Sequence, residues 1–68
     1  MNGRQKIATI LHRRDGISWN EAYNVVEQCK EEVEWALARG DRLEAVEEIV
    51  TDFLGLEPDY LNDLLDDY

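Results

Sequence analysis

Apolar residues recur every three or four positions in four stretches of the chain, at about residues 4–14, 18–39, 41–54 and 57–65. This spacing places them on one face of an α-helix, and no stretch shows the alternating pattern of a β-strand. We therefore predict an all-α fold, a compact bundle of three to four helices. The core-facing positions are Ile7, Ile10 and Leu11; Ala22, Val25, Val26, Cys29, Val33, Ala36 and Leu37; Leu43, Val46, Ile49, Val50, Phe53 and Leu54; and Tyr60, Leu61, Leu64 and Leu65.

The ends of the predicted helices carry local signals. Gly16, Gly40 and Gly55 each follow an apolar stretch, as is typical of glycines that end helices. Ser18 and Glu21 have the spacing of a capping box, in which the serine hydroxyl accepts a hydrogen bond from the backbone N–H three residues later. We expect short glycine-containing turns between the helices.

The later helix starts are predicted in the same way. Asp41 and Glu44 repeat the capping-box spacing, and Glu57 followed by Pro58 suits a helix with proline at its first position. Because the link around Gly40 is very short, we expect the second and third helices to pack antiparallel as an αα-hairpin.

The 68 residues carry a net charge of −9, from 16 acidic and 7 basic side chains, and this charge is unevenly distributed. A basic N-terminal helix (residues 1–14, charge +4) precedes an acidic bundle (residues 15–68, charge −13) within one predicted domain. Such a protein repels nucleic acids and anionic membranes and attracts basic surfaces. The basic residues of the first helix are Arg4, Lys6, Arg13 and Arg14.

No apolar stretch is long enough to span a membrane, no secretory leader is recognisable, and one cysteine cannot form an internal disulfide. We therefore expect a cytoplasmic protein. A chain of this length with 44% hydrophobic residues has a small core, which is consistent with a monomer or a weak homodimer.

Catalytic and metal-binding templates find no match in the sequence. His12 has neither a second histidine nor a nucleophile at a useful spacing, so we expect it to be exposed or to make a surface contact. Cys29 lies within the apolar stripe of the second helix, where a thiol is an inert part of the core. Glycine-rich phosphate loops and calcium loops are also missing. We expect no enzymatic activity, no cofactor and no bound metal.

Rows of carboxylates are the remaining candidate for function. A helical wheel places them opposite the apolar stripes, at four-residue steps that span about 6 Å along the helix axis. Such rows resemble the phosphates along a nucleic acid strand. The candidate partner-binding residues are Glu27, Glu31, Glu34 and Trp35 on the second helix, Glu44, Glu47, Glu48 and Asp52 on the third, and Asp59 and Asp63 on the fourth, where Asp66 and Asp67 add further charge.

Two interpretations of these rows stay open. In the first, the acidic faces only keep a small bundle soluble. In the second, they form a binding surface. The second explains why the chain keeps like charges four residues apart, although their repulsion costs roughly a few tenths of a kcal/mol per pair. Trp35 lies away from the apolar stripe, so either another helix covers it or it is an exposed anchor for a partner. Trp19 and Tyr23 are expected to cover the end of the core, while packing and contact both remain open for Tyr60 and Tyr68.

Three segments of the chain resemble small acidic proteins of bacteriophages and prophages. They read DGISWNEA (residues 15–22), ARGD (38–41) and LGLEPDYL (54–61), and the likeness spans about residues 15–65. Anti-CRISPR proteins and other DNA mimics belong to this group. The resemblance implies an acidic surface that occupies a cationic nucleic-acid channel of a host defence complex, in the bacterial cytoplasm.

The leading hypothesis is therefore an inhibitor that binds the positively charged nucleic-acid site of another protein and acts by competition. Trp35 or a terminal tyrosine would supply the short-range anchor. The alternative is a helical interaction or assembly module whose apolar stripes are completed by a second copy or by a partner helix. The first hypothesis predicts binding that weakens with salt, and the second predicts association that tolerates salt.

Overall fold

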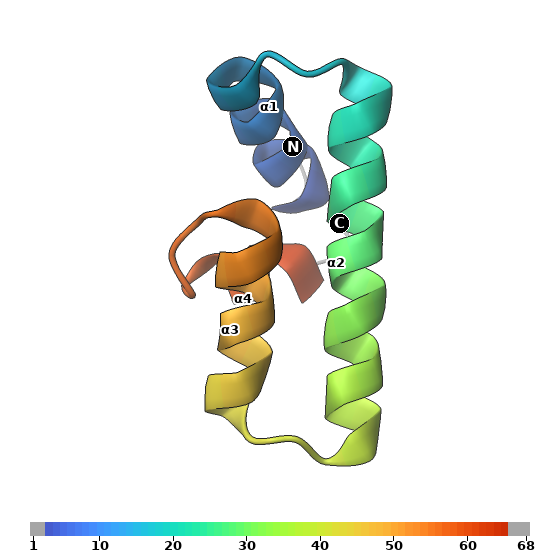
Figure 1. Cartoon of the computed structure of the whole chain (residues 1–68), viewed down its shortest axis with the longest axis vertical. Coiled ribbons are helices and arrows are strands. Elements are labelled where there is room, and N and C mark those ends of the chain that lie inside the picture. The colour runs from blue at the N-terminus through green and yellow to red at the C-terminus, as the bar shows by residue number, and fades with distance from the viewer. Residues whose placement is uncertain (1–2, 66–68) are drawn as a thin grey trace.

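A computed structural model describes residues 3–65, and all regular secondary structure in this range is helical (Figure 1). The helices are α1 (Gly3–Asp15), α2 (Trp19–Arg39), α3 (Leu43–Leu54) and α4 (Tyr60–Leu65). The predicted all-α bundle is confirmed. Asp66, Asp67 and Tyr68, which the sequence analysis also names, lie outside the described residues.

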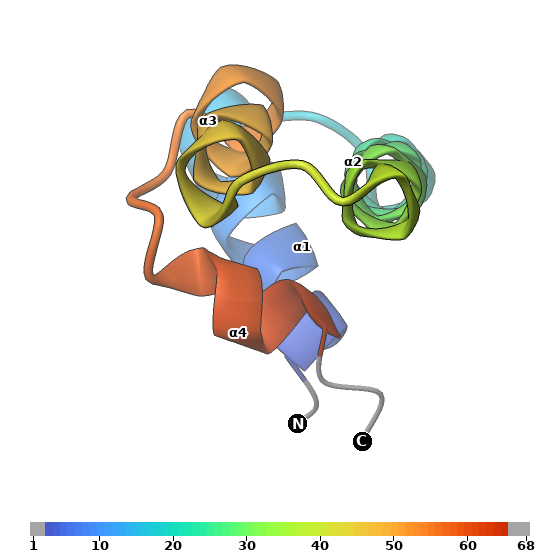
Figure 2. The ribbon, with the colours of Figure 1, turned by 90° about the horizontal axis from the view of Figure 1, so that it is seen from below.

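The other three helices lie on one side of α2, which is the longest (Figures 1 and 2). α1 lies beside the N-terminal half of α2, and α3 runs antiparallel to its C-terminal half, so the predicted αα-hairpin is confirmed. α4 packs against α1 and also contacts α2 and α3. No other described helix covers the opposite side of α2.

The start of α2 and the ends of α2 and α3 follow the local signals closely. Ser18 is the N-cap of α2, and its Oγ accepts a hydrogen bond of 3.1 Å from the Glu21 N–H. Gly40 and Gly55 follow α2 and α3 with φ angles of 81° and 63°, in the left-handed region that glycine adopts without steric cost. The Gly40 N–H donates to Leu37 O, which closes the last turn of α2.

Two predicted helix starts are wrong. The N-cap of α3 is Arg42, with no side-chain capping bond, because the Asp41 N–H donates to Ala36 O and so belongs to the end of α2. α4 begins at Tyr60, because Glu57 and Pro58 form a tight turn in front of it, in which their carbonyls accept hydrogen bonds from the N–H groups three residues later.

The core lies between α2 and the other three helices. Most of the predicted apolar positions are buried, but Leu37, Leu43, Phe53 and Leu65 are between 38% and 62% exposed. Leu37 and Leu43 flank the turn between α2 and α3, at the end of the hairpin farthest from α1, where no third helix covers them (Figure 1). Phe53 and Leu65 lie in the last turns of α3 and α4. The buried residues are Ile7, Ala8, Leu11, Ala22, Val26, Cys29, Val33, Ala36, Val46, Val50, Leu54, Leu61 and Leu64.

The N-terminal end of α1 lies directly against the backbone of α4. A Cβ atom placed on Gly3 would overlap the main-chain carbonyl of Asp63, so only glycine permits this approach. The basic first helix is therefore part of the bundle, with its apolar face buried through Ile7, Ala8 and Leu11.

Candidate functional site

The uncovered side of α2 carries the most exposed large apolar residue among those described. Trp35 is 65% exposed, and together with Glu31, Glu34 and Ala38 it lines a shallow depression of about 350 Å³. The buried residues of α2 form the opposite face of the helix, toward α1, α3 and α4. The Trp35 depression, as these four residues are called below, therefore faces away from the rest of the bundle.

Trp35 is not part of the core. The interpretation that another helix covers it is wrong, because α1, α3 and α4 all pack against the other side of α2. The remaining interpretation, an anchor for a partner, stays a prediction. A wheel places Trp35 on the polar side of α2, but it does not show on which side the neighbouring helices lie.

The charges around the Trp35 depression are uncompensated within residues 3–65. Glu31 and Glu34 are exposed, and no cation of the described chain forms an ion pair with either. Arg39, one turn beyond Trp35, is instead paired with Asp41, with 2.8 Å between Nη2 and Oδ2. This hydrogen bond raises the pKa of the Arg39 guanidinium.

Two of the predicted partner-binding acids are engaged inside the molecule. The Arg4 guanidinium donates to Glu27 over 2.8 Å, and the Lys6 ammonium donates to Asp63 over 3.3 Å. The Lys6 nitrogen also lies 5.6 Å from the centre of the Tyr60 ring. Basic residues of α1 thus connect it to α2 and to α4, and Glu27 and Asp63 are less available to a partner.

The predicted acids of α3 form a separate row. Glu44, Glu48 and Asp52 are exposed, whereas Glu47 is half-buried. A second shallow depression, of about 400 Å³, lies at the start of this helix and is lined by Asp41, Arg42, Glu44, Ala45 and Glu48.

The acidic rows of α2 and α3 point in opposite directions. The buried valines of the two helices face one another across the core, so the polar face of each helix is directed outward on its own side. Asp59 is exposed in the turn before α4. One flat partner surface cannot contact both rows at once, whereas a cleft that encloses the protein can.

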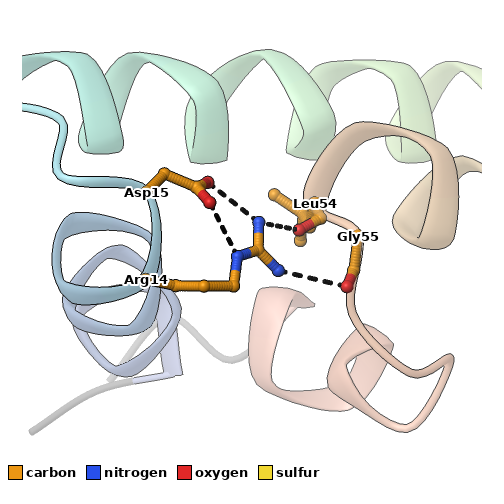
Figure 3. A network of polar contacts seen from close by, with 4 residues as sticks. All are labelled: Arg14, Asp15, Leu54 and Gly55. Atoms are coloured by element: carbon orange, nitrogen blue, oxygen red, sulfur yellow. Dashed lines mark hydrogen bonds and ion pairs between the residues drawn. The ribbon is translucent and has the colours of Figure 1, made fainter.

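The contacts of Arg14 could not be predicted from the sequence. Its guanidinium donates to the carbonyls of Leu54 and Gly55, over 2.8 Å and 3.1 Å, at the C-terminal end of α3 (Figure 3). It also forms two hydrogen bonds of 2.9 Å with Asp15. α3 has no basic residue in its own last turn, so Arg14 supplies the cation that its free carbonyls favour. The lack of a basic residue in the last turn of α3 is the one local feature of the sequence that could have indicated this contact.

The Arg14–Asp15 pair affects the protonation of both groups. The hydrogen bonds from Arg14 lower the pKa of Asp15, and the same bonds raise the pKa of Arg14. Because both side chains are 41% exposed, solvent screens this pair strongly, and its role is to orient the guanidinium toward α3.

His12 makes the surface contact expected of it. Its ring stacks on Trp19 with 4.2 Å between ring centroids, and Nδ1 lies 2.6 Å from the carbonyl oxygen of Ile17. Since a carbonyl only accepts, Nδ1 carries the proton of this bond. Trp19 was expected to cover the end of the core, but it is 46% exposed and contacts His12 and Tyr23 instead. Tyr23 packs against the core as expected.

The thiol of Cys29 is buried in the core, as predicted, and burial raises its pKa to about 11. Across residues 3–65, no group of three or more histidine, cysteine or acidic side chains is placed to hold a metal ion. None of the described helices is long and apolar enough to cross a membrane.

Comparison with protein-family models, with curated proteins and with solved structures finds no match to this chain. The acidic faces and the Trp35 depression are therefore the features of the molecule that indicate a function.

Proposed function

We propose that this protein is a small acidic inhibitor that binds the positively charged nucleic-acid site of another protein and blocks it by competition. The observation that carries the proposal is the placement of exposed acids on opposite sides of a narrow bundle. Within residues 3–65, no ion pair engages Glu31 and Glu34, which lie beside the exposed Trp35, or the α3 row of Glu44, Glu48 and Asp52. A duplex likewise presents phosphates on both of its sides.

The spacing and the surroundings of the acids support this proposal. Glu44, Glu48 and Asp52 follow one another at four-residue steps, which correspond to about 6 Å along α3. The basic residues of α1 that form ion pairs, Arg4, Lys6 and Arg14, meet Glu27, Asp63 and Asp15. They leave the acids of the α3 row and of the Trp35 depression without a cation from α1. A basic cleft would meet negative charge on two sides.

The target class follows from the resemblance to anti-CRISPR proteins. We place the protein in the bacterial cytoplasm, as a phage or prophage product directed against a CRISPR effector or another nucleic-acid-binding defence protein. On this proposal the protein has no catalytic role, binds no cofactor and does not bind nucleic acid itself.

A pull-down from a bacterial lysate that contains CRISPR effectors tests the proposal. Bound proteins are identified by mass spectrometry after parallel washes at low and high salt. We expect a nucleic-acid-binding protein to be retained at low salt and released at high salt, because contacts between exposed charges are screened. The captured protein should lose its nucleic acid when this protein is added.

Matched charge variants make the test specific. Glu31→Lys with Glu34→Lys should abolish the competition, and Glu44→Lys with Glu48→Lys should weaken it. The control, Glu21→Lys with Glu57→Lys, changes the net charge equally at exposed positions that lie outside both rows and away from Trp35. Equal competition by all three double variants would show that only net charge matters and would refute the proposal.

The exposure of Leu37 and Leu43 favours a second candidate function, that of an assembly module. These side chains are 47% and 62% exposed beside the turn between α2 and α3. A second copy that covers them would produce a concentration-dependent dimer that persists in high salt. Sedimentation velocity of the wild-type protein and of Leu43→Asn separates the two functions, because only the dimer requires Leu43.

A further inference from the structure

The Trp35 depression combines groups that suit a planar cation. An exposed indole ring lines the depression together with two carboxylates, and Ala38, one turn farther along α2, has too small a side chain to cover it. Among the described residues, no ring or cation contacts Trp35, whereas Trp19 stacks on His12. The site therefore offers an unused aromatic surface within a negative field.

The nearest cation on the same helix is held away from this ring. Arg39 follows Trp35 by four residues, a spacing at which side chains on a helix meet. Its guanidinium is instead bound to Asp41 in the turn after α2, over 2.8 Å. This pair keeps Arg39 from occupying the place that a cation of a partner would take.

We propose that the Trp35 depression binds an arginine side chain of a basic protein partner. The guanidinium stacks on the indole and forms hydrogen bonds with Glu31 or Glu34. Tryptophan is the strongest aromatic partner for a cation. Arginine stacks and donates in one plane and is more weakly hydrated than lysine, so it fits this combination better.

This inference rests on the proposed function, because it takes the partner to be a basic protein. It adds that the recognition depends on the chemistry of one side chain as well as on charge. Phosphate-bearing ligands are disfavoured by Glu31 and Glu34. A second copy of the chain is the other possible occupant, since Arg13 is exposed.

Calorimetric titration with two capped peptides tests the inference. Both are twelve-residue glycine–serine peptides with four evenly spaced cations, arginine in one and lysine in the other. We expect the arginine peptide to bind about 2- to 5-fold more tightly, the size of an exposed cation–π contribution. Trp35→Leu should abolish this preference and leave the residual salt-dependent binding of both peptides.

Two further variants test the contributions of the Arg39–Asp41 pair and of the two carboxylates, and a third is the charge control. Asp41→Asn should weaken binding of the arginine peptide, because it releases Arg39 to cover the indole. Glu31→Gln with Glu34→Gln should weaken both peptides, whereas Glu21→Gln with Glu57→Gln removes the same charge away from Trp35 and should preserve the arginine preference. Circular dichroism confirms that each variant is folded.

Equal binding of the two peptides, no binding of either, or an arginine preference that survives Trp35→Leu would each overturn the inference. A dimer of the wild-type protein that Trp35→Leu dissolves would assign the depression to a second copy and overturn it too. If the arginine preference holds while nucleic-acid competition fails, the proposed function is refuted and the arginine site remains.

Discussion

Gly3 determines how closely α1 approaches α4. The absence of a side chain at this position lets the helix lie against the main chain of Asp63, and no other residue type has this freedom. Two neighbouring contacts, the ion pair of Lys6 with Asp63 and the ring of Tyr60 beneath Lys6, depend on the same approach. A single glycine thus positions several side chains.

Gly3→Ala should destabilise the protein by about 1–3 kcal/mol, because the added methyl group overlaps backbone that cannot move aside easily. Helix propensity alone favours alanine over glycine by about 1 kcal/mol, so it predicts the opposite sign. Urea denaturation of both proteins measures the difference. A more stable Gly3→Ala variant would show that α1 does not dock as described.

Cys29 should react slowly with disulfide reagents in the folded protein. Burial raises its pKa to about 11, so the reactive thiolate is a very small fraction at neutral pH, and the core also excludes the reagent. We expect a rate at pH 8 at least about 100-fold below that of the urea-unfolded chain. Fast labelling without denaturant would mean that α2 opens readily.

At the scale of elements, α1 and α3 are coupled by the Arg14 guanidinium. The donor belongs to the last turn of α1, and its acceptors are the carbonyls that end α3. Helix ends normally obtain such partners locally. Here the partner comes from 40 residues away in the chain, so the end of one helix depends on the position of another.

Arg14→Gln should lower the free energy of unfolding by about 1 kcal/mol, since it removes a charged donor from the carbonyls of Leu54 and Gly55. Arg13→Gln is the control, because this neighbouring arginine is exposed and forms no hydrogen bond or ion pair with another described residue. Thermal denaturation should separate the two variants. An equal effect in both would show that only the charge of α1 matters.

The same substitution should change the titration of Asp15. Its pKa is lowered in the folded protein, so the interaction stabilises the fold above the ordinary pKa of an aspartate and is lost as the pH falls through the lowered value. In Arg14→Gln, carbon-13 NMR should show the carboxyl titrating at higher pH. An unchanged titration would contradict the hydrogen bonds to Arg14.

Local sequence signals predicted where the helices lie in the chain, but they did not predict the contacts between residues far apart in the chain. The starts and ends marked by Ser18, Gly40 and Gly55 were correct because each depends on the backbone within a few residues. The surroundings of Arg14 and Trp35 could not be predicted in this way. Which carbonyls Arg14 meets, and whether Trp35 is covered, depend on where α1, α3 and α4 lie around α2. A helical wheel contains no such information.

At the scale of the whole molecule, the 7 basic side chains balance fewer than half of the 16 acidic ones, which leaves the net charge of −9. The ion pairs of Arg4, Lys6, Arg14 and Arg39 are all at least partly exposed, and two of them hold α1 in place. The remaining acids repel one another across the surface. Salt acts on both kinds of interaction, weakening the pairs and the repulsion together.

We expect the repulsion to dominate, because acids outnumber bases 16 to 7. The melting temperature should therefore rise by several degrees between low and high sodium chloride concentration, as screening relieves the self-repulsion. The variant with Glu21→Lys and Glu57→Lys, whose charge is four units less negative, should respond less. A melting temperature that falls with salt would mean that the ion pairs of α1 contribute more.

The contact of α1 with α4 also has a kinetic consequence. Lys6 and Asp63 are 57 residues apart in the chain, whereas α2 and α3 are joined by a turn of a few residues. Closing the longer loop costs more chain entropy, so the hairpin is expected to form first and the two ends of the chain to meet last. Substitutions at Gly3 should then accelerate unfolding and leave the refolding rate nearly unchanged.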